Sequence, residues 1–156
     1  MRPVRRPHYN LDMSAAELYD RDFYEWTVRN AELLRAGRVA DADLAHIAEE
    51  IEDMGKRERR ELLSRLGILL SHLLKWQAPP ERRGQSWSAT IRLQRREIVR
   101  LIDEMPSLKR YLAESLPKAY EEGVLGAAAE TGLPVEAFPS TCPFELDAVL
   151  DVEFLP

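Results

Sequence analysis

The chain has 156 residues, 45% of them hydrophobic and 31% charged, a composition typical of a globular protein of one domain. Its one cysteine excludes an intrachain disulfide and any metal site built from several cysteines. The first residues, MRPVRRPHYN, lack the apolar stretch of a secretory signal, and apolar runs such as residues 66–70 are too short to span a membrane. We therefore expect a cytoplasmic protein without a membrane segment.

The net charge of −5 hides an uneven distribution along the chain. Residues 1–55 carry 7 basic and 12 acidic side chains, residues 56–100 carry 12 and 4, and residues 111–156 carry 1 and 9. A basic middle segment between acidic ends can pair internally, with a second copy of the chain, or with an anionic partner.

In chain order, residues 1–13 are expected to form an irregular arm, because Pro3 and Pro7 interrupt regular structure. Residues 14–37 are predicted to form the first helix. Ser14 and Glu17 have the spacing of a capping box, Asp20 is an alternative start, and Gly37 is a natural stop. Asn30 is the polar exception on the apolar face of this helix.

The second and longest helix is predicted over residues 43–77, with Asp41 or Asp43 as its cap and Pro79 and Pro80 beyond its end. Gly55 and Gly67 inside it favour a kink or a close helix crossing. Its apolar residues recur with helical periodicity and form one stripe that is expected to be buried: Ile51, Met54, Leu62, Leu66, Leu69, Leu73 and Trp76.

Two further helices are predicted after the loop at residues 78–86, one ending near Glu104 and one from about Leu108 to Gly132, with a kink or restart at Pro117. A short last helix is expected to open at Pro143 and end near Leu150. The predicted fold is therefore all-α: a bundle of four principal helices plus a short C-terminal helix, in a single domain over residues 14–156.

Three polar residues of the long helix, Glu58, Arg65 and His72, follow Ile51 at seven-residue steps and lie inside or at the edge of its apolar stripe. They are about 10 Å apart along the axis, so each needs a partner from elsewhere. Gln94 lies on a facing stripe, and Glu61 can reach Arg65. Two alternatives are satisfied polar groups that fix helix register and a small polar pocket between helices. A third is a row at the bundle edge whose polar ends reach water.

A candidate anion-binding face is formed by Arg92, Arg96 and Arg100, which are spaced four residues apart in the third predicted helix. Arginines on an exposed helix face can contact phosphates. A solvated face that pairs with the acidic C-terminal third is the alternative. The acidic net charge and the lack of a recognised nucleic-acid motif favour this alternative.

Other candidate sites are weaker. The carboxylates of Glu49, Glu50, Glu52 and Asp53 could share Mg²⁺ with a phosphorylated substrate, but the facing helix lacks a second acidic pair of suitable spacing. His46 and Glu50 alone do not make a zinc site. Cys142 lies at the expected start of the last helix, and a structural role is favoured over a reactive thiol. We predict no catalytic residue, no metal site and no cofactor.

Several motifs resemble those of the bacterial family called domain of unknown function 29, from about Tyr19 to the end of the chain. The motifs are HLLKWQ at 72–77, PPERRGQSW at 79–87, TIRLQRREI at 90–98, ETGLP at 130–134, FPSTCPF at 138–144 and FLP at 154–156. Phe144, where tyrosine is usual, and Lys56 and Arg57, in place of the commoner GKSERR, depart from the family pattern. The resemblance implies an all-helical fold and no known activity.

The sequence favours a small helical protein-interaction module without catalytic activity, whose partner is another protein or a second copy of the chain, for example in a homodimer. One alternative is a nucleic-acid-associated protein that uses the arginine face. The other is a metal-dependent hydrolase of a phosphorylated small molecule that uses the acidic cluster.

Overall fold

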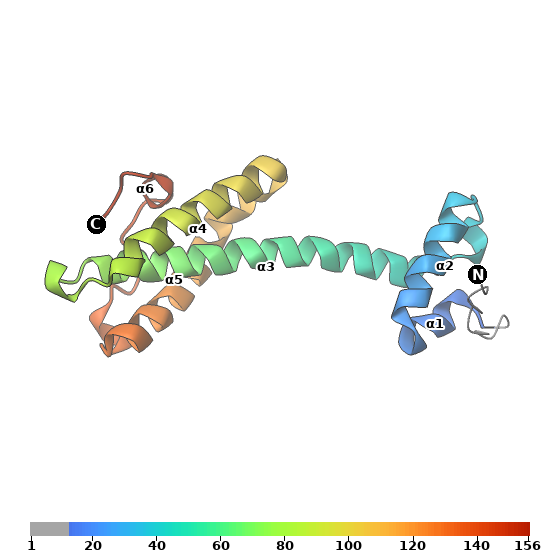
Figure 1. Cartoon of the computed structure of the whole chain (residues 1–156), viewed down its shortest axis with the longest axis horizontal. Helices are drawn as coiled ribbons and strands as arrows, with labels where there is room; N and C mark the ends of the chain where they lie inside the picture. Colours follow the sequence, from blue (N-terminus) through green and yellow to red (C-terminus); the bar gives the residue numbers. More distant parts are fainter. Residues whose placement is uncertain (1–12) are drawn as a thin grey trace, which may run out of the picture. The chain divides into compact units, whose positions relative to one another are not determined.

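The structure, a computed structural model, describes residues 13–156, so the predicted arm lies, Met13 excepted, outside the described residues (Figure 1). The all-α class is confirmed, with no strand in the described part of the chain. The helices are α1 (Ala15–Arg21), α2 (Phe23–Arg35), α3 (Leu44–Trp76), α4 (Gln85–Glu104), α5 (Lys109–Thr131) and α6 (Leu146–Leu150). Short 3-10 turns join them: η1 (Val39–Asp41), η2 (Pro80–Arg82), η3 (Pro106–Leu108) and η4 (Val135–Ala137).

The chain forms two units, the first ending at Gly55 and the second beginning at Lys56. Helix α3 contributes its first twelve residues to unit 1 and the rest to unit 2. The prediction of a single domain over residues 14–156 stays a prediction.

Unit 1 begins with two helices where the sequence predicted one, and the prediction of a continuous helix over residues 14–37 is wrong. The capping box is present, since the Ser14 backbone N–H donates to Glu17 Oε2 at 2.8 Å and the Glu17 N–H donates to Ser14 Oγ. The break falls at Asp22, whose carboxylate accepts from the Glu25 N–H at 3.0 Å. Because a short carboxylate offers the backbone an alternative partner, Asp22 ends α1 and caps α2.

Buried polar groups connect α2 to the start of α3 within unit 1. Asn30 donates to the Trp26 carbonyl at 2.9 Å and accepts from the Asp43 N–H at 2.8 Å. The Trp26 indole donates to the Asp43 carboxylate at 3.0 Å. Asp43, one of the two predicted caps, thus precedes α3, and Asn30, the polar exception on the first predicted helix, both donates and accepts a hydrogen bond.

The predicted apolar stripe of α3 is confirmed in unit 2 and wrong in unit 1. Leu62, Leu66, Leu69 and Leu73 are completely buried, whereas Ile51 and Met54 are 63% and 60% exposed. In unit 1 the aromatic side chains pack on a different face of α3: the Tyr19 ring stacks on His46 with centroids 3.9 Å apart, and its hydroxyl donates to Glu50 at 2.8 Å. This contact does not cover Ile51 and Met54, which remain exposed.

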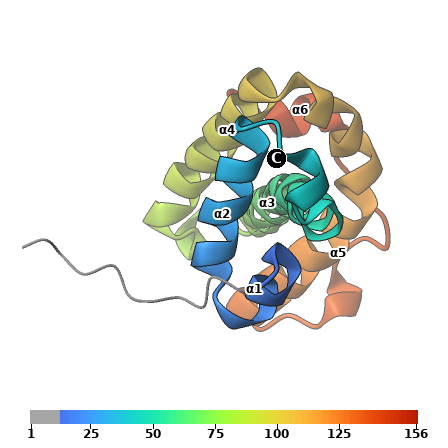
Figure 2. The same cartoon turned by 90° about the vertical axis from the view of Figure 1, so that its right-hand side faces the viewer.

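In unit 2, α4 and α5 lie on two sides of the second half of α3, with α6 beside α4 (Figures 1 and 2). Helices α3 and α5 cross closely at glycines, and a close crossing is one of the two outcomes predicted for Gly67. A Cβ atom on Gly123 would lie 3.1 Å from the Gly67 carbonyl oxygen, and one on Gly126 would lie 3.0 Å from Ser71 Oγ. Helix α5 continues through Pro117, so of the predicted kink or restart the restart is wrong and the kink stays a prediction. Gly132, with φ of +71°, ends it as predicted.

The C-terminal segment is attached to α4 by Arg95, which is 2% exposed. Its guanidinium donates to the carbonyl oxygens of Val149 at 2.8 Å, Val152 at 3.3 Å and Phe154 at 2.7 Å. Helix α6 begins at Leu146, later than predicted, so Pro143 is not its first residue. A single side chain thus satisfies the carbonyl groups at and beyond the end of α6.

We predict that Arg95→Met lowers the free energy of unfolding by about 3 kcal/mol, because it leaves buried carbonyl groups without a donor. Urea unfolding followed by circular dichroism measures this change. The control is Arg96→Met, whose side chain is 74% exposed and should change stability by less than about 0.5 kcal/mol. Equal effects of the two substitutions would contradict the role assigned to Arg95.

Candidate functional site

The most unusual group of unit 2 is the fully buried ammonium of Lys75, near the end of α3. Its Nζ lies 2.5 Å from Glu130 Oε2 on α5 and 4.9 Å from the centre of the Trp87 ring on α4. It also donates to Nε2 of His72, one turn earlier, at 3.3 Å. A buried charge needs such a set of partners, so Lys75 holds three helices together at one point.

The contacts of His72 determine its tautomer. Its Nδ1 lies 2.9 Å from the Ile68 carbonyl oxygen and must carry the proton, which leaves Nε2 as the acceptor for Lys75. Burial is the main cause that lowers the pKa of His72, and the Lys75 charge lowers it further, against the opposing effects of the Ile68 carbonyl and Glu130. His72 is therefore neutral at pH 7.

A groove of about 330 Å³ lies beside this cluster, between α3 and α5, and we call it the α3–α5 groove. Both helices supply its lining: Ser64, Gly67, Ile68, Ser71, His72, Glu122, Gly126 and Glu130. Within residues 13–156, the buried hydroxyl of Ser71 has no hydrogen-bond partner. Such a group in the wall of a cavity favours a ligand or an ordered water.

The four residues of the predicted polar pocket lie in separate places in the structure. Arg65 donates to Glu61 at 2.7 and 2.9 Å and to Gln94 at 3.4 Å, and Glu97 lies 3.9 Å away. The structure thus brings Arg65 and Gln94 together and confirms the pairing of Arg65 with Glu61. His72 instead joins Lys75 and Glu130, and Glu58 is half-buried elsewhere on α3. The four residues do not share one pocket.

On the predicted anion-binding face, Arg92 and Arg96 are exposed. Arg100 is held by carboxylates of its own helix, with Glu97 at 3.1 Å and Glu104 at 2.8 Å. Arg96 also lies 3.5 Å from Glu97, and the Arg100 side chain is still 45% exposed, so all three guanidinium groups reach solvent. Phosphate binding by Arg92 and Arg96 stays a prediction.

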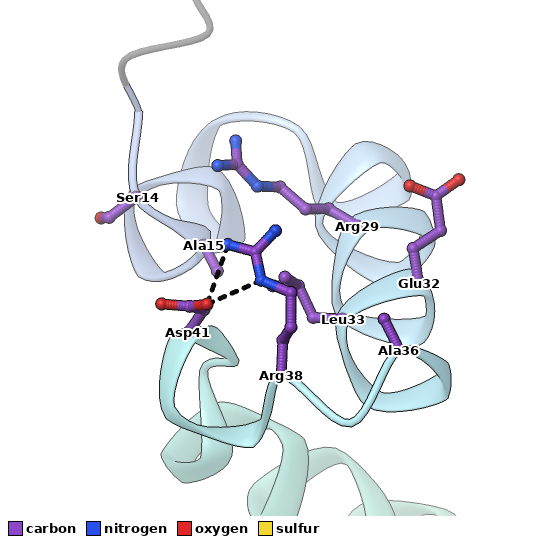
Figure 3. Close-up of a pocket in the computed structure, with 8 residues that line it drawn as sticks. All are labelled: Ser14, Ala15, Arg29, Glu32, Leu33, Ala36, Arg38 and Asp41. Carbon is purple, nitrogen blue, oxygen red and sulfur yellow. Dashed lines mark hydrogen bonds and ion pairs between the residues drawn. The ribbon is translucent and has the colours of Figure 1, made fainter.

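Unit 1 contains a pocket of about 500 Å³, shown in Figure 3, between α1, α2 and η1. Arg38 and Asp41, which both line this pocket, form an ion pair at 2.8 Å. Arg29 extends across the pocket from α2. Two guanidinium groups and two carboxylates, of Glu32 and Asp41, make its lining neutral overall. The pocket therefore has no strong preference for an anion or a cation.

The acidic cluster of α3 is also in unit 1. Glu50 accepts from Tyr19, and this hydrogen bond is the main cause that raises the pKa of Tyr19 to about 12. In the part of the chain that the structure describes, no three histidine, cysteine or acidic side chains are grouped to hold a metal ion. Cys142 is half-buried and lies outside α6, and burial raises the pKa of its thiol.

These features define an all-α protein organised around buried cations, with no helix between residues 13 and 156 long and apolar enough to cross a membrane. The chain belongs to the family described as Domain of unknown function DUF29, whose model matches residues 18–155. No curated protein and no solved structure matches the chain.

Sequence analysis did not identify Lys75, Glu130 or Ser71 as site residues. Lys75 and Glu130 lie in HLLKWQ and ETGLP, two of the motifs that carry the family resemblance, and a charged residue among the leucines of α3 was a usable signal. The partner of Lys75 is 55 residues away in the chain, a separation that helical periodicity cannot bridge. For Ser71, the sequence contains no comparable signal.

The ion pair predicts an asymmetry between its two members, because Lys75 is fully buried and the Glu130 side chain is 53% exposed. Glu130→Gln leaves a buried charge uncompensated and should lower the free energy of unfolding by about 2 kcal/mol. Lys75→Met leaves a carboxylate that water can solvate, so its effect should be smaller. Urea unfolding of both variants tests this order, and a larger loss for Lys75→Met would contradict it.

A pH dependence follows from the lowered pKa of His72. The folded state binds the proton more weakly than the unfolded state, so stability falls as the pH drops below about 6.5, the ordinary histidine pKa. We expect the wild type to lose more stability than His72→Gln between pH 7.5 and pH 5.5. Urea unfolding at both pH values measures the loss, and identical losses would show that His72 is not the group responsible.

Proposed function

We propose that this protein is a cytoplasmic, non-enzymatic interaction module that associates with a second copy through α3. The observation that carries the proposal is an uncovered apolar face in unit 1, called here the α3 apolar face. Leu44, Ile51 and Met54 are 50%, 63% and 60% exposed, and Ile47 is half-buried. These side chains lie on one side of α3.

The spacing of these four residues supports a helical partner. They are separated by three, four and three positions, which is the spacing of the seam of a two-helix coiled coil. A seam of this kind is normally covered by another helix, since exposed contiguous apolar surface favours association. A helix from a second copy of the chain supplies such a cover.

The charge distribution supports a second copy as that partner. Residues 1–55 have 12 acidic and 7 basic side chains, whereas residues 56–100 have 4 and 12. The acidic segment that carries the α3 apolar face therefore finds opposite charge in the basic segment of another copy. Opposite charge speeds encounter and selects the partner.

Self-association predicts a mass of twice the 18.0 kDa of one chain in size-exclusion chromatography with light scattering. The double substitution Ile51→Glu with Met54→Glu should reduce the mass to that of one chain, because it places charges in the apolar seam. The helical content should not change, since both positions are exposed.

The matched control is Leu125→Glu on α5, at a residue that is also 60% exposed. It should leave the mass unchanged. A wild-type mass of 18.0 kDa at high concentration, or dissociation by the Leu125 substitution alone, would overturn the proposal.

A further inference from the structure

A second groove of unit 2, of about 530 Å³, is lined by α5 and by η4 with the residues after it, and we call it the α5–η4 groove. Its lining is mainly apolar. Tyr120, Val124 and Leu125 come from α5, and Val135 and Phe138 come from the opposite wall. The groove shares no lining residue with the α3–α5 groove, so it is a separate surface.

Contacts of the chain itself fix the walls of the α5–η4 groove. Gly132, with φ of +71°, ends α5, and Pro134 precedes η4. Tyr120 is 3% exposed, and its hydroxyl donates to the Pro139 carbonyl at 2.7 Å, which attaches the segment after η4 to α5. A partner therefore meets a groove that is already formed, and this lowers the ordering cost of binding.

Two apolar side chains are exposed in this groove. Leu125 is 60% exposed and Val135 is 45% exposed, although Val124, in the same lining, is only 6% exposed. Because Leu125 and Val135 come from different walls of one groove, they belong to a single concave apolar surface. Such a surface is typical of a binding site for a partner that contributes apolar groups.

Carboxylates make the α5–η4 groove negative. Glu121 lies on the α5 wall and Glu136 on the η4 wall, and both are exposed. Within the described residues neither carboxylate has an ion-pair partner, whereas Glu130, on the same helix α5, pairs with Lys75. Residues 111–156 carry 9 acidic side chains and 1 basic one, which adds to the negative potential. The groove therefore attracts a basic partner and repels an acidic one.

The backbone around the groove restricts the form of the partner. The N–H and C=O groups of α5 are used within the helix, and no strand edge is present between residues 13 and 156. An extended peptide therefore finds no row of backbone groups with which to pair. An amphipathic helix needs none, because its backbone pairs internally and its apolar side chains insert from one side.

We propose that the α5–η4 groove binds an amphipathic helix of another protein, whose apolar side chains insert between Leu125 and Val135. Lysine or arginine side chains of this helix pair with Glu121 and Glu136. The α3 apolar face of a second copy does not match this description, since residues 49–53 beside it include four carboxylates. The proposed contact uses another unit and another surface than self-association, and it does not depend on self-association.

The test uses an alanine-rich peptide of about 16 residues, a length that can form a helix in water. The peptide carries leucines on one side and lysines beside them. One control peptide has glutamate at each lysine position, and a second has serine at each leucine position. Nuclear magnetic resonance of the ¹⁵N-labelled full chain follows the backbone amide signals of Leu125, Val135 and Phe138 during each titration.

We expect saturable shifts of these signals with the lysine–leucine peptide, and binding weaker by about tenfold or more with either control. Equal binding of the serine control would show a general attraction to the acidic C-terminal third. Equal binding of the glutamate control would show apolar adsorption without recognition of charge. Either result, or no binding of any of these peptides, would overturn the proposal.

Charge reversal in the groove tests the role of its carboxylates. Glu121→Lys with Glu136→Lys should make the glutamate peptide a better ligand than the lysine–leucine peptide. The control, Glu114→Lys with Glu122→Lys, reverses two other exposed carboxylates of α5 that do not line this groove, and it should retain the preference for lysine. A preference that stays unchanged in the first variant, or reverses in both, would contradict the assignment.

Leu125→Gln tests the apolar contact, because glutamine keeps the helix propensity of leucine and removes apolar surface. It should weaken binding of the lysine–leucine peptide by about tenfold. Leu93→Gln on α4, at a residue that is 43% exposed, is the matched control and should leave binding unchanged. Equal effects of the two substitutions would place the peptide elsewhere on the protein and end the proposal.

Other occupants of the groove would produce results of their own. If a second copy of the chain filled it, Leu125→Gln alone would lower the molar mass in light scattering. If the N-terminal residues of the chain filled it, Arg5→Glu with Arg6→Glu would shift the groove signals of the full chain without any peptide. We expect neither effect, and either one would overturn the assignment to another protein.

Discussion

A fully buried ammonium group is the constraint on which unit 2 depends. An isolated charge of this kind would be excluded from a protein interior, so Lys75 fixes the positions of everything that compensates it. Near the end of α5, Glu130 must lie level with Lys75, and at the start of α4, Trp87 must lie beside Lys75. His72 must keep its proton on Nδ1, the nitrogen that faces the Ile68 carbonyl. Packing of the leucine core stabilises unit 2 but is not directional, whereas the ion pair of Lys75 fixes the helices at one position along one another.

Arg95 fixes register by a different route. Lys75 is matched by an acidic side chain, whereas Arg95 is matched by main-chain oxygens of the C-terminal segment. Both cations, and several of their partners, lie in the motifs that relate this chain to its family: HLLKWQ, PPERRGQSW, TIRLQRREI, ETGLP and FLP. In this chain these motifs therefore contribute contacts that hold the fold together.

Periodicity and capping chemistry predicted most of the helices, because both are local. Asp43, Gly132 and the capping box at Ser14 are positions where one side chain or one backbone conformation decides an end. The break at Asp22 was missed, since aspartate is tolerated inside a helix and only its contact with Glu25 shows that it caps one. The orientation of α3 in unit 1 was missed because a helical wheel shows which residues share a face and not which face meets Tyr19.

The candidate site was less predictable than the fold. Arg65 with Glu61 follows from a spacing of four residues, but Lys75 with Glu130 requires a distant helix, α5, that runs alongside α3 in the same direction. The close packing of Ser71 against α5 depends on Gly126, a residue that in the sequence is one glycine among seven. A contact that depends on the missing side chain of a glycine has no residue in the sequence that marks it.

The attachment of the C-terminal segment to Arg95 determines how this part of the chain can vary. The guanidinium contacts only carbonyl oxygens of residues 149, 152 and 154, and these are present whatever side chains the residues carry. These hydrogen bonds therefore do not depend on the side chains of the three residues, but they do depend on the number of residues between them. One inserted or deleted residue would shift the carbonyls out of reach, so this attachment makes the segment intolerant to a change of length.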